Sequence, residues 1–184
     1  MPEARKESFF IELLKFIVIA ALIVFPVRFF IAQPFIVSGA SMDPTFENGQ
    51  YLIIDEISYR FSEPKRGEVI IFRPPRAPQE FYIKRIIGLP GETVSIEDGR
   101  IYVTTNGQKH VLDEPYISRN GNGADATYEL EANEYFVMGD NRPESSDSRV
   151  WGPLPSDNIV GRAFVRLLPA NTLSLFPGSV TYPQ

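Results

Sequence analysis

The sequence predicts a mainly β protein, an antiparallel β-sandwich or barrel-like fold, preceded by one N-terminal transmembrane helix. Three observations lead to this prediction. The longest apolar stretch lies near the start of the chain, from Phe9 to Ala32. After it, short apolar runs alternate with turns that contain glycine or proline, which is typical of strands. Few later segments have the helical period of about 3.6 residues, which favours a β-sandwich or barrel.

Residues 9–32 form the predicted transmembrane helix. A spanning helix needs about 20 apolar residues, and this stretch has that length if Glu12, Lys15 and Arg28 reach toward the membrane interfaces. More basic residues precede the uncharged core than follow it. The positive-inside rule then places residues 1–8 in the cytoplasm as a short tail and the rest of the chain on the extracytoplasmic face.

Two alternatives to a retained membrane helix remain. Ser38 and Ala40 are small residues with the spacing of a signal-peptide cleavage site. Against cleavage, Arg28 interrupts the apolar run and the distance from the uncharged core to Ala40 is long. An amphipathic helix of the folded core is disfavoured because the stretch is apolar all round. N-terminal sequencing of the mature protein distinguishes a retained helix from a removed one.

The predicted strands all lie in residues 33–184, which we interpret as an extracytoplasmic catalytic β-domain. An Asp98-Gly99 pair between two of them predicts a tight hairpin. Residues 92–137 are expected to form a reduced second domain or hairpin extension, with a mobile loop in the polar, glycine-rich part. The tail after Pro169 is expected to be irregular. The predicted strands are Gln50–Ile54, Glu68–Phe72, Phe81–Ile87, Glu92–Ile96, Arg100–Thr104, Glu134–Met138 and Ile159–Leu167.

Composition excludes several kinds of function. The chain has 184 residues and a net charge of -5, with no basic run after residue 33, which argues against nucleic acid as a partner. It has no cysteine, so disulfides, thiolate metal sites and cysteine nucleophiles are excluded. Its single histidine, His110, cannot hold zinc without several carboxylates. We therefore expect no metal and no other cofactor.

A serine and a lysine carry the predicted chemistry. Ser41 stands in a short turn of small residues, and a serine needs an adjacent base to become a nucleophile. His110 lies in a polar hairpin segment and is not expected to be that base. Lys84 lies within the apolar run Tyr82–Ile87. Burial there would lower the lysine pKa, so that a neutral amine could take the serine proton. The alternative is an ordinary strand lysine that reaches out to solvent.

The segment Met138–Arg149 is the second candidate cluster. Taken alone, it is a loop of Asx and serine turn formers. It could also supply a hydroxyl that orients the lysine amine and a carboxylate–guanidinium pair that holds the loop. The spacing of Asp147 and Arg149 suits such a pair.

Four segments, in this order and after an apolar N-terminal stretch, carry a family resemblance. Together they resemble the type I signal peptidases, the serine–lysine leader peptidase family of bacteria and organelles. The resemblance extends from about Phe9 to Phe176, and the combination of segments is highly specific. The segments are Ser38–Phe46, Arg66–Phe72, Tyr82–Gly91 and Gly139–Gly152.

The resemblance implies roles for individual residues. Ser41 matches the nucleophile, Lys84 the general base, and Ser145 the serine that positions the lysine. Asp147 and Arg149 match a structural salt bridge in the loop that also contains Asp140. The backbone N–H of Ser41 would donate to the oxyanion. Many members add a hydroxyl where this chain has Gly39, so another group is expected to fill that place. The residues that match the substrate pockets are Phe35, Val37, Met42, Tyr82 and Ile83.

The predicted function is that of a membrane-bound serine endopeptidase that removes N-terminal signal peptides from exported preproteins. Its partners would be these preproteins and the lipid bilayer of a bacterial plasma membrane or a thylakoid. Two alternatives remain. A membrane-tethered β-domain could bind peptides without cutting them, although it gives no reason for the serine and the lysine. A self-cleaving serine–lysine protein of the SOS-repressor type would need an internal cleavage site and has no place for the membrane anchor.

Overall fold

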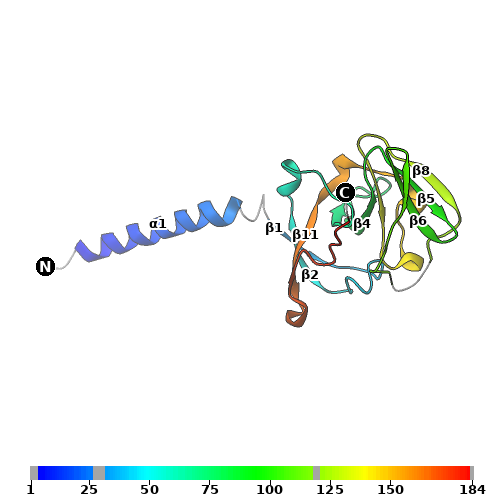
Figure 1. The fold of residues 1–184 in the computed structure, drawn as a ribbon. Helices are drawn as coiled ribbons and strands as arrows, with labels where there is room; N and C mark the ends of the chain where they lie inside the picture. Colours follow the sequence, from blue (N-terminus) through cyan, green and yellow to red (C-terminus); the bar gives the residue numbers. More distant parts are fainter. Residues whose placement is uncertain (1–3, 27–31, 118–120, 183–184) are drawn as a thin grey trace.

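The computed structural model describes residues 4–26, 32–117 and 121–182. An N-terminal helix projects away from a body of antiparallel strands (Figure 1). The body contains one large and one small sheet, so the mainly β prediction is confirmed. Five short helical segments connect strands in the body: η2 (Ser58–Arg60), η3 (Arg142–Glu144), α2 (Ser148–Trp151), η4 (Ser156–Asn158) and η5 (Ala170–Thr172).

Helix α1 runs from Ala4 to Pro26. Several of its large apolar side chains are 62–70% exposed, among them Phe9, Phe16 and Leu22. It ends at a proline, which lacks the backbone N–H that a helix needs and crowds the preceding turn.

None of the helices within the described ranges is long and apolar enough to cross a membrane. The sequence prediction carried the helix to residue 32, but Ala32 already begins strand β1, so that boundary is wrong. Residues 27–31 of the predicted span, and residues 1–3 of the predicted tail, lie outside the described part of the chain.

The large sheet has eight strands in the order β1-β2-β11-β3-β4-β9-β10, with β12 paired to β11. Register shifts in β11 mark bulges against both of its long neighbours, and bulges increase local twist. The strands are β1 (Ala32–Ile36), β2 (Tyr51–Asp55), β3 (Val69–Phe72), β4 (Tyr82–Gly88), β9 (Glu134–Met138), β10 (Leu154–Pro155), β11 (Ile159–Leu168) and β12 (Ser174–Leu175).

The small sheet has four strands in the order β7-β6-β5-β8. They are β5 (Thr93–Glu97), β6 (Arg100–Thr105), β7 (Gln108–Val111) and β8 (Ala126–Glu129). Asp98 and Gly99 both have positive φ, 47° and 70°, as a tight hairpin turn between β5 and β6 requires. This sheet falls within residues 92–137, where the sequence predicts a reduced second domain.

Strand β4 lies between hydrophobic clusters and is therefore buried along most of its length. Ile87 packs in a cluster with the small sheet, whereas Ile86 packs on the opposite face with Ile70 and Phe72. Strands buried on both faces read as continuous apolar runs. The two cations in β4, Lys84 and Arg85, are consequently carried into the interior, where they are 3% and 0% exposed.

Each of the seven predicted strands overlaps an observed one, and no bound differs by more than one residue. Five strands were not predicted. β1 lies at the end of the apolar stretch that was assigned to the helix, all of β7 is exposed, β8 lies in the polar segment expected to hold a mobile loop, and β10 and β12 have only two residues each.

Candidate active site

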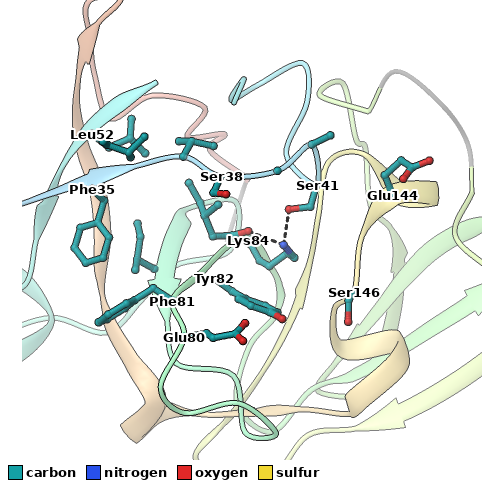
Figure 2. Close-up of a pocket in the computed structure, with 16 residues that line it drawn as sticks. Phe35, Ser38, Ser41, Leu52, Glu80, Phe81, Tyr82, Lys84, Glu144 and Ser146 are labelled. Atoms are coloured by element: carbon teal, nitrogen blue, oxygen red, sulfur yellow. Dashed lines mark hydrogen bonds between the residues drawn. The ribbon is translucent and has the colours of Figure 1, made fainter. Parts of the chain in front are cut away.

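The turn that carries Ser41 follows directly from β1 and is closed by backbone hydrogen bonds. The N–H of Asp43 donates to the carbonyl of Ala40 at 3.1 Å, and that of Phe46 to the carbonyl of Met42 at 2.9 Å. Met42 and Phe46 are 1% and 0% exposed, so they anchor the turn in the core. The tight turn leaves the Ser41 hydroxyl free to face the groove (Figure 2).

Gly39 allows the chain to enter this turn. Its φ is +94°, a conformation that glycine adopts without the steric penalty of a side chain. Its N–H donates to Oδ1 of Asn48 at 3.0 Å. The Gly39 N–H is therefore occupied by the Asn48 side chain.

Lys84 meets Ser41 inside a groove (Figure 2). Its Nζ lies 2.6 Å from Ser41 Oγ and also donates to the carbonyl of Ile83 at 2.9 Å. Burial removes water from the amine and lowers the Lys84 pKa to about 8, because a desolvated charge is disfavoured. A substantial fraction of neutral amine therefore exists near neutral pH.

Two carboxylates near Lys84 oppose this effect, but each has its own arginine. Asp147 and Asp140 raise the Lys84 pKa, and Arg149 lowers it. Asp147 is paired with Arg149 and Asp140 with Arg85. Since each negative charge is balanced locally, desolvation outweighs attraction and the lysine pKa stays low.

The Asp147–Arg149 pair lies where the sequence predicts it. Two hydrogen bonds of 2.8 Å join the carboxylate to the guanidinium. Burial opposes ionisation of Asp147, but the hydrogen bond and charge of Arg149 outweigh it and lower the Asp147 pKa. Asp147 also accepts the N–H of Gly139 at 3.0 Å, and Arg149 donates to the carbonyl of Gly121 at 2.7 Å. The pair thus fixes the loop after β9.

Asp140 binds Arg85, a partner that the sequence reasoning missed. The guanidinium makes hydrogen bonds of 2.8 Å and 2.6 Å to the two carboxylate oxygens, and both side chains are fully buried. Thr45, from the turn that carries Ser41, donates to the same carboxylate at 2.5 Å. The sequence held a usable signal: an arginine inside an apolar strand needs a buried partner.

Ser145 does not contact Lys84 by a hydrogen bond. Its Oγ is buried and has no hydrogen-bond partner within the described ranges. It packs against Gly139, where a Cβ would collide with Ser145 Oγ and with the carbonyl oxygen of Ser41. The contact that holds the lysine amine beside Ser41 is instead the carbonyl of Ile83, a backbone group that the sequence did not single out.

The loop after β9 also holds the turn itself. Asn141 donates from Nδ2 to the carbonyl of Ala40 at 2.9 Å, and its N–H donates to the carbonyl of Ser41 at 3.1 Å. These bonds fix the two peptide groups on either side of the Ser41 Cα. Asn141 lies next to Asp140 in the polar segment, but no sequence pattern marks it as a residue that would hold the turn.

A groove of about 430 Å³ leads to Ser41 and Lys84. Of the residues predicted to line substrate pockets, Met42 is absent from the wall because it points from the turn into the core. The sequence did not single out Glu80 and Glu144, which add two carboxylates to the wall. The apolar and aromatic lining includes Phe35, Val37, Leu52, Ile71, Tyr82 and Ile83.

The groove separates two strand edges. In the register of the sheet, β1 pairs only with β2. β4 pairs with β3 from Tyr82 onward, but its pairing with β9 begins only at Arg85. The side of Tyr82–Lys84 that faces away from β3 therefore has no strand partner among the described residues. An extended peptide could add there as a strand.

His110 lies on β7 and is exposed, so it takes no part in this arrangement. Trp151 packs against Phe72 with their ring centroids 5.8 Å apart, as a core residue does. A serine hydroxyl that contacts a buried amine inside a groove is a constellation that fits a serine peptidase.

Comparison with known proteins agrees with this class. A model of the family described as "Signal peptidase, peptidase S26" matches residues 10–168. The chain is 38% identical to the probable signal peptidase I-2 of Synechocystis, over 94% of this chain and 80% of that protein. It is 36% identical to signal peptidase I T of Bacillus subtilis, over 92% of this chain and 91% of that protein.

A solved signal peptidase I from Enterococcus faecalis is 34% identical, covers 55% of this chain and 97% of that one, and has a TM-score of 0.45. The family match and the identities of the curated relatives decide the assignment. The chain belongs to the signal peptidase family, peptidase S26. It is a signal-peptide-cleaving serine peptidase, as the sequence analysis predicts.

Proposed function

We propose that Ser41 and Lys84 are the catalytic pair with which this peptidase cuts signal peptides from exported preproteins. The observation that carries the proposal is the 2.6 Å contact between Ser41 Oγ and the buried Lys84 Nζ. A hydroxyl is a weak nucleophile without a base. A lysine with a pKa of about 8 is a far better proton acceptor at neutral pH than a solvated one, whose pKa is about 10.4.

The reaction would proceed in two halves. Neutral Lys84 accepts the Ser41 proton as Oγ attacks the scissile carbonyl carbon, and the backbone N–H of Ser41 donates to the developing oxyanion. The lysine then gives its proton to the leaving amine, which departs with the mature protein and leaves an ester on Ser41. Lys84 next takes a proton from the water that attacks the ester, and it returns this proton to Ser41 Oγ as the ester C–O bond breaks. The signal peptide leaves with a free carboxyl group, and the neutral amine is restored.

The substrate would bind as an extended strand between the edges of β1 and β4. Backbone hydrogen bonds to such edges give affinity with little dependence on sequence. Side chains of an extended peptide alternate between opposite sides, so every second one would point into the apolar wall that contains Phe35 and Ile83.

We also propose that the apolar N-terminal segment that contains helix α1 attaches the enzyme to a lipid bilayer in a single pass, with the β-domain on the extracytoplasmic face. Support comes from the exposed apolar side chains of α1, such as Phe10 and Phe16 at 68% and 70%, and from the separation of this helix from the β-domain (Figure 1). A protease-protection assay on intact cells or right-side-out vesicles would test the orientation. Protection of the β-domain in sealed vesicles of that orientation would contradict it.

The decisive experiment compares the full chain with Ser41→Ala and Lys84→Ala on a preprotein substrate. We expect both variants to lose cleavage and still bind the substrate. Ser62→Ala, an exposed serine whose hydroxyl bonds to the Ser58 carbonyl, is the matched control and should cleave normally. Normal cleavage by either active-site variant would reject the proposed pair. Binding without any cleavage by the wild-type chain would favour the non-catalytic peptide-binding alternative.

A further inference from the structure

The small sheet contacts the active-site loop through a buried arginine that the proposed reaction does not use. Arg142, just after Asp140 and Asn141, donates from Nε to the carbonyl of Gly139 at 3.0 Å. Its side chain is fully buried and pairs with Glu114, which is 6% exposed. Asn122, from the same connection between β7 and β8, also accepts a hydrogen bond from Arg142.

Tyr116 makes a second contact between the same connection and the site. Its ring stacks on Arg85, with the guanidinium carbon 3.8 Å from the ring centroid. Its hydroxyl donates to Glu114 at 3.0 Å. One short segment after β7 thus supports both buried arginines of the site: Glu114 holds Arg142, and Tyr116 covers Arg85.

These arginines in turn hold the backbone that surrounds the proposed pair. Gly139, which Arg142 contacts, packs against the Ser41 carbonyl and against Ser145. Arg85 binds Asp140, which accepts a hydrogen bond from Thr45 in the turn that carries Ser41. Movement of either guanidinium would therefore shift the turn or the loop, and with it the contact between hydroxyl and amine.

We infer that Glu114 and Tyr116 are positioning residues for the reaction. They lie in the connection between β7 and β8 of the small sheet, are not among the residues that line the groove, and act through Arg142 and Arg85. The inference rests on the proposed function of Ser41 and Lys84. The connection between β7 and β8 would then hold the turn that carries Ser41 and the loop after β9 in a fixed position relative to each other.

Glu114 would affect the reaction by fixing the positions of Ser41 and Lys84, not through the effect of its charge on the Lys84 pKa. Glu114 is absent from the groups whose charge shifts the Lys84 pKa. Its loss should therefore change the rate by misplacing atoms, and small misplacements can cost up to about a hundredfold in rate. Loosening of the loop would also admit water to Lys84, which raises a pKa that burial lowers.

The test measures kcat, KM and the pH dependence of kcat for the full-length Glu114→Gln variant on one preprotein. Glutamine keeps one acceptor oxygen for Arg142, but it removes the charge and replaces the second acceptor oxygen with an N–H donor. We expect kcat to fall by about tenfold or more and KM to stay within about twofold. The acidic limb of the kcat–pH profile should move to higher pH. Glu97→Gln is the matched control, because Glu97 lies on the same sheet in an exposed pair with Lys109.

A purely structural role would lower the folded fraction without moving the pH midpoint, so thermal unfolding is recorded alongside. Unchanged kcat, or a loss fully explained by unfolded protein, would overturn the inference. If Glu114→Gln does not fold, Tyr116→Phe replaces it: it keeps the ring on Arg85 and removes the hydroxyl from Glu114. Unchanged kinetics in that variant would likewise overturn the inference. Activity of Ser41→Ala would instead refute the proposed function, so the two failures are distinguishable.

Discussion

Lys84 and Arg85 are neighbours in one strand, and both are buried, yet their surroundings differ completely. Lys84 contacts a neutral hydroxyl and a backbone carbonyl. Arg85 contacts a buried carboxylate through two hydrogen bonds. On one face of β4, burial without a counter-charge lowers a pKa; on the other, a carboxylate balances a guanidinium that stays charged. The residue type and the counter-charge, rather than the degree of burial, separate a candidate base from a structural cation.

The largest expected effect comes from giving Lys84 the chemistry of its neighbour. Lys84→Arg keeps a cation in the site but cannot release its proton at any working pH. We expect kcat to fall by about 10²–10⁴-fold, the usual contribution of a general base. Single-turnover cleavage of a preprotein measures it. Substantial activity in this variant would show that a neutral amine is not required.

The converse change removes the counter-charge from Arg85. Asp140→Asn leaves a buried guanidinium without a carboxylate, which costs about 3–5 kcal/mol of stability. Denaturant unfolding of the wild type and the variant gives the difference in the free energy of unfolding. Glu97→Gln removes an exposed carboxylate from a pair with Lys109 and should cost only about 0–1 kcal/mol. Equal losses of unfolding free energy in the two variants would contradict the difference expected between a buried and an exposed ion pair.

Removing the uncompensated amine should stabilise the protein. The folded-state pKa of Lys84 is about 8, below its model-peptide value of 10.5, so the folded state binds fewer protons than the unfolded state between those values. Lys84 therefore costs stability at pH 7, and this cost falls as the pH rises through that range. We expect Lys84→Met to be more stable by about 1–3 kcal/mol at pH 7, and the gain to shrink at pH 10. A less stable variant at pH 7 would contradict this.

The smallest effect concerns the arginine that faces Lys84 from the loop. The charge of Arg149 lowers the Lys84 pKa, and Arg149 also balances Asp147, whose charge raises it. In Arg149→Gln both effects push the Lys84 pKa upward. Because the neutral amine is the active form, the acidic limb of kcat should move from near pH 8 to higher pH. A profile that stays in place would show that this arginine does not act on Lys84 through charge.

Much of the fold could be predicted because short apolar runs and turn-forming residues are visible within a few neighbouring positions of the sequence. The Asp98-Gly99 hairpin and seven of the strands follow from such patterns. Strand β1 was not predicted; it begins at Ala32, the last residue of the stretch that was assigned to the helix. β7 is exposed along its length, so burial leaves no alternation in its sequence. Pairing order, such as β11 between β2 and β3, depends on contacts between distant residues.

For the site, the residue types were more predictable than their partners. Lys84 in an apolar run and the spacing of Asp147 and Arg149 are visible in the sequence. That Asp140 binds Arg85, 55 residues away, depends on how β4 pairs with β9. The occupied Gly39 N–H and the inward direction of Met42 depend on the path of one turn. Neither is encoded in a pattern that can be read along the chain.

The unpaired edge of β4 is only three residues long, from Tyr82 to Lys84. A cleavable segment must therefore present a short run of backbone whose own N–H and C=O groups are free, which a helix or a folded domain cannot do. The enzyme would in this way distinguish unfolded segments from folded ones by their free backbone groups, before any side chain is recognised. A leader that forms part of a helix or of a folded domain would not be cut.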